Sequence, residues 1–110
     1  MIKFQRITTK DATLYNYMEQ LMTASFPSEE YRPLEELRNY TDTKTHFYCN
    51  IILHHDTPVG FITYWDFGHF YYVEHFAIDP SLRNGGHGKN VLNHLCQQLN
   101  KPIILEVEMP

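Results

Sequence analysis

Hydrophobic positions in the first part of the chain change from an alternating to a helical period. Residues Ile2 to Thr8 alternate between apolar and polar side chains, which predicts a strand, and the Thr-Lys-Asp sequence after it favours the start of a helix. The next apolar side chains recur with the spacing of one helix face: Leu14, Tyr17, Met18, Leu21 and Met22. Pro33 favours the first turn of a short second helix that continues to Leu37. These patterns predict a strand followed by two helices.

Three segments with alternating apolar side chains follow. The first places four side chains on one face: Phe47, Cys49, Ile51 and Leu53. The second places five on one face: Val59, Phe61, Thr63, Trp65 and Phe67. The third runs from Phe70 to Ile78 and ends at Asp79-Pro80, because proline cannot continue the hydrogen-bonded ladder. Strands joined by such short loops predict an antiparallel meander.

The last third of the chain predicts a loop, a helix and a buried strand. The loop is rich in glycine and spans Ser81 to Gly88, and the helix after it has one apolar face: Leu92, Leu95, Cys96 and Leu99. Cys96 is therefore expected to be a buried thiol. Residues Ile103 to Val107 have the composition of a buried strand, and a helical crossover favours its parallel pairing with the preceding strand. The fold class predicted is a single α/β domain, in which the strand meander is followed by the glycine-rich loop, a helix and a parallel strand.

Composition narrows the classes of function. The 110 residues suit one small domain, and a content of 43% hydrophobic and 15% aromatic residues can supply a packed core. Thirteen acidic residues against nine basic ones disfavour general binding to nucleic acid or to anionic membranes. Cys49 and Cys96 match neither a zinc spacing nor a disulfide framework, and no metal is expected. There is no signal peptide and no apolar run of about 20 residues, so we expect a cytoplasmic protein without membrane contact.

The aromatic residues of the strands allow one further interpretation, a sheet on which nucleic-acid bases stack. These residues are Tyr48, Tyr64, Trp65, Tyr71 and Tyr72. Acidic neighbours and the lack of a basic face disfavour this interpretation, and no nucleic-acid partner is expected.

The glycine-rich loop is the strongest functional signal, because it joins a strand to the start of a helix. Free N–H groups and the positive end of the helix dipole bind phosphate there, and glycine lets a ligand approach the main chain closely. Residues 81–101 contain no Asp or Glu, whereas Arg83, Lys89 and Lys101 are basic. Two common phosphate motifs do not fit: a Walker A loop needs Gly in place of Arg83, and a dinucleotide fingerprint needs Gly in place of Val91.

The loop resembles the pyrophosphate loop of the GNAT-type N-acetyltransferase superfamily, which has the pattern Arg/Gln-x-x-Gly-x-Gly/Ala. This chain has Arg83-Asn84-Gly85-Gly86-His87-Gly88. The preceding residues Tyr72 to Pro80 are similar to the fourth strand of that family, and the order of elements agrees along the whole chain. The resemblance implies an acyl-CoA N-acyltransferase fold, and an enzyme that transfers an acetyl group from acetyl-coenzyme A to a primary amine by direct attack in a ternary complex.

The resemblance also implies which residues bind the coenzyme. Main-chain groups of three residues would pair with the pantetheine arm: Phe76, Ala77 and Ile78. The loop would bind the pyrophosphate through Arg83, Asn84, Gly85, Gly86, His87 and Gly88, assisted by Lys89 at the start of the helix.

Acetyl transfer to an amine requires a proton acceptor. An alkylammonium group with a pKa near 10.4 must lose its proton before it can attack a thioester, which costs about 4 to 5 kcal/mol at pH 7. Glu74 and His75 are the candidate catalytic residues, and the period of a strand puts them on opposite faces, so at most one is expected to face the site. Glu74 is preferred, because acidic residues in this strand can serve as the base in similar enzymes. The alternatives are a solvated Glu74 and a hydrogen-bonded core His75.

The chain departs from the family pattern at its end. Members of the superfamily continue past the strand represented by Ile103 to Val107 into another helix and a final hairpin, whereas this sequence stops at Pro110. We expect residues 1–110 to be a single GNAT-like domain that is incomplete at its C-terminus, with a parallel edge strand that a homodimer would cover. The alternative function is a non-catalytic CoA-binding or interaction module, or an inactive fragment of an acetyltransferase. The acceptor is indicated only weakly, as a cation, by the acidic residues Glu29, Glu30, Glu35 and Glu36.

Overall fold

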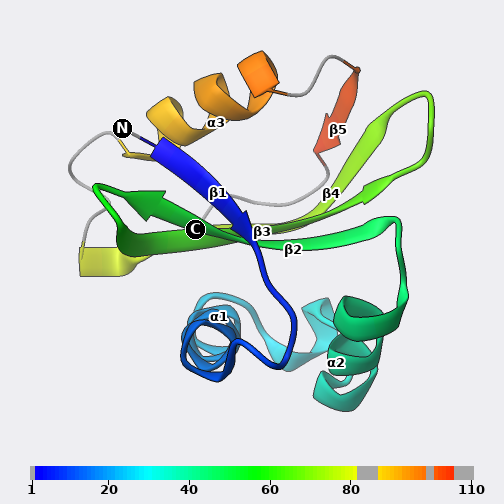
Figure 1. Cartoon of the computed structure of the whole chain (residues 1–110). Coiled ribbons are helices and arrows are strands. Elements are labelled where there is room, and N and C mark those ends of the chain that lie inside the picture. Colours follow the sequence, from blue (N-terminus) through cyan, green and yellow to red (C-terminus); the bar gives the residue numbers. More distant parts are fainter. Residues whose placement is uncertain (1, 82–86, 99–100, 106–110) are drawn as a thin grey trace.

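The structure is a five-stranded sheet with helices on both faces (Figure 1). It is a computed structural model that describes residues 2–81, 87–98 and 101–105. The elements are β1 (Ile2–Arg6), α1 (Ala12–Ser25), a 3₁₀ turn (Ser28–Glu30), α2 (Leu34–Thr43), β2 (Phe47–His54), β3 (Thr57–Asp66), β4 (Tyr71–Ile78), α3 (His87–Gln98) and β5 (Ile103–Leu105). The strands lie in sequence order; β1 to β4 pair antiparallel, and β5 pairs parallel with β4. The predicted order of elements and fold class are confirmed.

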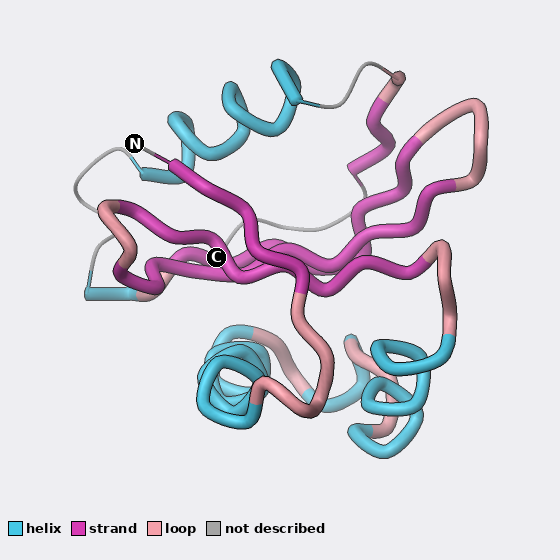
Figure 2. The backbone as a smooth tube through the Cα atoms, viewed as in Figure 1, coloured by secondary structure: helices cyan, strands magenta, loops and turns pink. Residues whose placement is uncertain are grey.

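The helices form two layers that cover opposite faces of the sheet. Figure 2 shows α1 and α2 together below the strands and α3 alone above them. α1 buries four side chains against the sheet, namely Tyr15, Met18, Leu21 and Met22. α2 begins directly after Pro33, as predicted, but continues to Thr43, well beyond the predicted end at Leu37. The sheet is therefore enclosed between two layers, and each of its faces has its own core.

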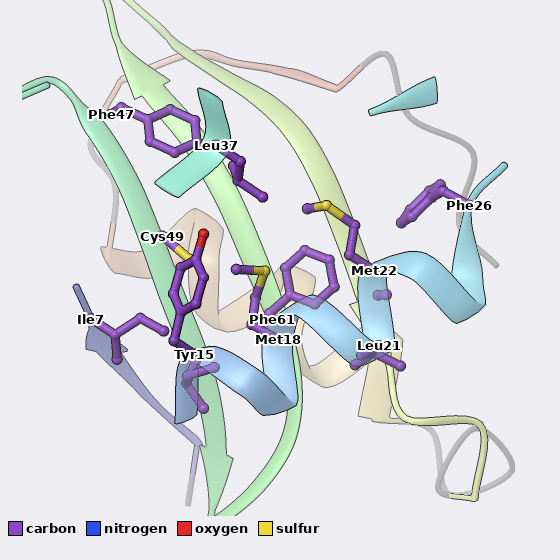
Figure 3. Packing of buried hydrophobic residues seen from close by; sticks show 12 residues of the cluster. Ile7, Tyr15, Met18, Leu21, Met22, Phe26, Leu37, Phe47, Cys49 and Phe61 are labelled. Carbon is purple, nitrogen blue, oxygen red and sulfur yellow. The ribbon is translucent and has the colours of Figure 1, made fainter. Parts of the chain in front are cut away.

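The larger core lies between the sheet and the α1/α2 layer. Figure 3 shows Met18 of α1 against Phe61 of β3, and Tyr15 beside Cys49 of β2. The predicted inward face of β2 is confirmed, because Phe47, Cys49 and Ile51 all belong to this core. Burial raises the pKa of the Cys49 thiol to about 12, so it remains protonated and behaves as an apolar side chain. The side chain of Cys96 lies outside the described part of the structure.

The predicted face of β3 is wrong at its beginning, whereas at its end Phe67 stacks on Trp65 as a shared face requires. Ile52 pairs with Gly60 and Leu53 pairs with Pro58, so Val59 is an extra residue, a β-bulge. The bulge reverses the alternation, and Val59 packs in the core under α3, whereas Phe61 packs on the α1/α2 side. Phe67 follows the end of the strand, and 52% of its surface is exposed.

Candidate active site

A second β-bulge lies in β4 at the two candidate catalytic residues. Thr63 of β3 pairs with His75, and the next residue, Tyr64, pairs with Val73, so Glu74 is the extra residue. Glu74 and His75 consequently line the same cleft, on the α1/α2 side of the sheet. The prediction that they point to opposite faces is wrong, because strict alternation holds only where each residue has one partner across the ladder.

The cleft at the bulge has a volume of about 750 Å³. One wall is β4, with Tyr72, Glu74 and His75. The other wall is the connection between α1 and α2, which contributes Phe26, Glu29, Glu30, Tyr31, Arg32 and Pro33, together with Glu36 from the first turn of α2. Pro27 and Pro33 lie at the start and the end of this connection, and both have the extended backbone that proline favours. The connection thereby holds its polar side chains along the cleft.

Four carboxylates and one guanidinium give this cleft a strongly acidic lining. Arg32 donates a hydrogen bond to Oε1 of Glu74, and its Nη1 lies 3.6 Å from Oε1 of Glu36. Burial alone would lower the pKa of the Arg32 guanidinium, but the contacts with Glu74 outweigh burial and raise it. Glu35, which the sequence grouped with the other acids, is exposed on α2 and does not line the cleft.

The carboxylate of Glu74 is only partly satisfied. Its side chain is 14% exposed, and Oε1 accepts the hydrogen bond from Arg32. The second oxygen, Oε2, is buried and has no hydrogen-bond partner among the residues that the structure describes. Glu74 is therefore not a solvated surface residue, which was the alternative interpretation. Its Oε2 can accept a hydrogen bond from a ligand.

His75 is buried, and one of its ring nitrogens is engaged by the main chain. Nε2 lies 2.8 Å from the carbonyl oxygen of Glu30. A carbonyl only accepts hydrogen bonds, so Nε2 is the donor, and Nδ1 is the nitrogen of this ring that can accept a hydrogen bond or a proton. Nδ1 is buried and has no partner within the described ranges, and the ring meets Phe26 edge to face at 5.0 Å between centroids. His75 is hydrogen-bonded as the alternative interpretation proposed, and it also lines the cleft.

A second, more apolar cleft of about 440 Å³ adjoins the first. The two share Arg32, Tyr72 and Glu74, and the rest of the second lining is apolar or aromatic: Trp65, Phe67, Phe70 and Ile104. The Arg32 guanidinium lies over the Tyr40 ring, at 4.7 Å from its centroid, and at 5.9 Å from that of Trp65. Arg32 thus lies between an acidic and an aromatic region.

The predicted coenzyme residues occupy the last part of β4 and the start of α3. Pairing of β4 with β5 is described only for Tyr71 to Val73. Further along β4, the side chains of Phe76, Ala77 and Ile78 are buried, so a ligand would meet main-chain groups there, as the prediction requires. His87 and Gly88 begin α3, the first turn of which has no acidic residue, and Lys89 is exposed. Arg83, Asn84, Gly85 and Gly86 lie outside the described residues.

Within residues 2–81, 87–98 and 101–105, no three His, Cys, Asp or Glu side chains come together in a metal-binding arrangement. None of the described helices is long and apolar enough to cross a membrane.

This sheet, with β1 to β4 antiparallel and β5 parallel to β4, has the fold of the acyl-CoA N-acyltransferases. The sequence profile of the Acetyltransferase (GNAT) family matches residues 12–110, and the chain belongs to this family. A GNAT-family protein from Bacteroides thetaiotaomicron is 61% identical, with a TM-score of 0.94 over 98% of this chain. The chain spans 61% of the length of that protein. No curated protein matches the chain.

More distant structures share the fold alone. A ribosomal-protein-alanine N-acetyltransferase from Brucella melitensis is 14% identical, with a TM-score of 0.67 over 98% of this chain and 81% of its own. An aminoglycoside 6'-N-acetyltransferase complexed with coenzyme A is 19% identical, with a TM-score of 0.64 over 87% of this chain and 54% of its own. The fold therefore persists at low identity, and the acceptor of this chain has to be inferred from its own residues.

Arg32 is the site residue that sequence reasoning missed. It is 42 positions from Glu74, and no local pattern relates the two residues. The segment between Phe26 and Pro33 predicts only the end of one helix and the start of another. A signal existed nevertheless: one arginine lies beside two glutamates in the short segment between Pro27 and Pro33, and such a residue is a candidate for pairing within that segment or across the site.

Proposed function

We propose that this chain binds acetyl-coenzyme A along β4 and at the start of α3, and that it transfers the acetyl group to a primary amine held in the acidic cleft. Membership of the GNAT family and the relative complexed with coenzyme A support the choice of co-substrate. The observation that carries the proposal is the bulge in β4. It brings two proton acceptors, Oε2 of Glu74 and Nδ1 of His75, to a cleft beside the strand on which the pantetheine arm is expected to lie.

The coenzyme would be held mainly by main-chain groups. Free N–H groups at the start of α3, together with Arg83 and the glycines up to Gly88, suit a pyrophosphate, and no acid in the first turn of α3 opposes it. Main-chain groups of Phe76, Ala77 and Ile78 suit the amides of the pantetheine arm. The thioester supplies an activated acetyl group, and the acetyl carbonyl would end near the bulge.

Transfer then requires three changes of bonding. The acceptor arrives as an ammonium ion and gives one proton to Glu74 or His75. The amine nitrogen attacks the thioester carbonyl carbon, the carbon–sulfur bond breaks as the tetrahedral intermediate collapses, and the amide nitrogen loses a second proton. The leaving thiolate takes up one proton to become the thiol of coenzyme A. Overall an amide and a thiol form, and one proton is released for each ammonium consumed.

The cleft favours a cationic acceptor. Glu29, Glu30, Glu36 and Glu74 face one arginine across its volume, and such a field raises the local concentration of cations. A primary amine is protonated at neutral pH, so this field attracts the same group that later has to lose a proton.

The alternative is a module that binds coenzyme A without catalysis. It is favoured by the contact of Arg32 with the carboxylate that would serve as base. The two functions differ in turnover, since binding needs the loop but does not need a base.

Calorimetric titration with acetyl-coenzyme A, followed by an acetyl-transfer assay on a panel of primary amines, tests the proposal. Arg83→Glu should abolish saturable binding, whereas Lys10→Glu, an equal sign reversal at an exposed position remote from the site, should leave it unchanged. Glu74→Gln or His75→Gln should slow transfer by about 10² to 10⁴ while binding persists. Binding without transfer to any amine would favour the non-catalytic module, and binding that survives Arg83→Glu would refute the coenzyme site.

A further inference from the structure

The hydrogen bond that Arg32 donates to Glu74 has the same chemistry as the contact that an ammonium acceptor would make with this carboxylate. A guanidinium, like an ammonium, is a cation that donates hydrogen bonds to a carboxylate, and it occupies Oε1 of Glu74 within the acidic cleft. Glu74 belongs to the strand beside which the acetyl group is expected, so an acceptor nitrogen has to approach this carboxylate. Arg32 already occupies one oxygen of this carboxylate.

Arg32 makes two further contacts besides the one with Glu74. Its Nη1 lies 3.6 Å from Oε1 of Glu36, four residues further along the chain, and its guanidinium lies over the ring of Tyr40. Neither contact involves Glu74. The guanidinium can therefore leave Glu74 and keep an ion pair and a cation–π contact, so its displacement costs one interaction rather than all of them.

The existing contacts leave buried polar atoms unsatisfied. Oε2 of Glu74, Nε of Arg32 and Nδ1 of His75 are buried and have no hydrogen-bond partner in the described part of the chain. His75 is only 7% exposed and lines the same cleft. An ammonium group carries three donors, and Oε2 and Nδ1 are acceptors, so a ligand of this type could satisfy groups that Arg32 does not reach.

We infer that Arg32 is an internal competitor for the acceptor: it holds Glu74 within the acidic cleft, and the ammonium group of the acceptor displaces it toward Glu36 and Tyr40. This inference rests on the proposed function, since it assigns the acceptor to this cleft. Arg32 then acts as a specificity-determining residue. Only a ligand that brings its own positive charge can compensate Glu74 for the loss of the guanidinium, so neutral analogues of the amine are excluded. Release of Arg32 also leaves Glu74 able to take the proton.

The exchange can be measured without coenzyme and without turnover. Calorimetric titration measures affinity in the wild type and in every variant. Trp65, the single tryptophan of the chain, lines the adjoining apolar cleft beside Arg32, so in proteins that keep Arg32 its fluorescence also reports movement of the guanidinium. The probe is n-butylammonium chloride, titrated at constant ionic strength, with 1-butanol as the neutral analogue. Arg32→Gln is expected to bind the probe about tenfold more tightly than the wild type, if Arg32 holds Glu74 in about nine molecules of ten. Butanol should bind neither protein.

Arg38→Gln is the matched control for Arg32→Gln. Arg38 lies on α2 and pairs with Glu19 on α1 through two hydrogen bonds of 3.0 and 2.7 Å, away from the cleft. The two variants make the same change of charge. Arg38→Gln loses its ion pair with Glu19, whereas Arg32→Gln loses those with Glu36 and Glu74 and alone frees Glu74. Affinity that rises equally in both variants would show a general charge effect and overturn the inference. Affinity that is unchanged or lower in Arg32→Gln would overturn it as well.

A double-mutant cycle tests whether Glu36 pairs with the displaced guanidinium. Glu36→Gln should weaken binding of the probe several-fold while Arg32 is present, because the displaced guanidinium loses its partner, and should have a smaller effect in Arg32→Gln. Glu35→Gln, an exposed neighbour on α2, is the control and should have little effect in either background. Equal effects of Glu36→Gln in both backgrounds would refute this part of the exchange.

An Arg32 variant that fails to fold can be distinguished from a folded variant that no longer competes with the probe for Glu74. If circular dichroism shows that Arg32→Gln is unfolded, Arg32→Lys supplies the test: a lysine cannot hold two carboxylates as a guanidinium fork does, and probe affinity should rise by a smaller factor. Structural damage would lower affinity rather than raise it. Because these titrations need no coenzyme, absence of acetyl transfer together with tighter binding by Arg32→Gln would refute the proposed function alone. Absence of any response by both Arg32 variants would refute the exchange.

Discussion

Replacement of Gly60 by alanine tests how closely β3 and β4 approach at the expected coenzyme site. A Cβ atom at position 60 would lie 2.3 Å from the carbonyl oxygen of Ala77 and 3.1 Å from Cα of Ile78. Both of these atoms belong to the backbone of β4, which cannot rotate away as a side chain can. Ala77 and Ile78 are also two of the residues whose main chain is predicted to bind the pantetheine arm.

The size of the effect follows from this distance. Cβ atoms essentially never approach other heavy atoms closer than 3.0 Å, so the two strands have to separate by at least 0.7 Å. Overpacking of this kind costs about 1 to 3 kcal/mol of unfolding free energy. In a domain of this size each kcal/mol lowers the midpoint of thermal unfolding by about 4 to 8 °C, so Gly60→Ala should lower the midpoint by at least about 4 °C.

Thermal unfolding followed by circular dichroism measures the stability, and calorimetric titration measures acetyl-coenzyme A affinity. Gly68→Ala is the control: Gly68 has a φ of +89° and no atom within 4 Å of the added Cβ, so alanine costs backbone strain of about 1 kcal/mol without moving β4. Both variants should lose stability, and only Gly60→Ala should also lose affinity. A midpoint for Gly60→Ala within 2 °C of the wild type would refute the close approach, and equal affinity losses in both variants would refute its link to the coenzyme site.

Three further predictions concern the core and the surface. Met18→Ala removes a fully buried side chain and should cost about 2 to 5 kcal/mol in urea unfolding; a loss below 1 kcal/mol would contradict its central position. In a Cys96→Ser background, Cys49, whose pKa burial raises to about 12, should react with a thiol reagent at pH 8 only after unfolding, and rapid reaction of the native protein would contradict its burial. A hydrogen bond from the N–H of Gly68 and the ion pair with Lys101 lower the pKa of Asp66, so its carboxylate stabilises the fold above about pH 4, and this contribution is lost as the pH falls through the lowered pKa. The unfolding midpoint of Asp66→Asn should therefore lie below that of the wild type at pH 7 and approach it in acid, whereas a gap independent of pH would refute the assignment.

Periodicity alone was enough to predict the order of elements. Alternation marked β2, the i, i+3, i+4 spacing marked α1, and both signals are local, because they reflect which side of one element faces apolar surroundings. The loop from Arg83 to Gly88 was recognisable for a similar reason. A phosphate site at the start of a helix is built from consecutive residues, so a short stretch of sequence is enough to predict it. That stretch indicated the GNAT family, which the match of the sequence profile confirms.

The tertiary structure decided which side chains meet. Alternation assumes one partner for each residue, and the bulges at Val59 and Glu74 break that rule through pairing with another strand, which no single segment reveals. One bulge put Val59 into the opposite core, and the other brought Glu74 and His75 to one cleft. The ion pair of Arg32 with Glu74 has the same origin, since charges 42 residues apart become neighbours only when the α1–α2 connection packs over β4. The sequence by itself determined the elements and the class of protein, because both depend on local order. The composition of the acidic cleft was decided by the fold, because it depends on contacts between distant segments.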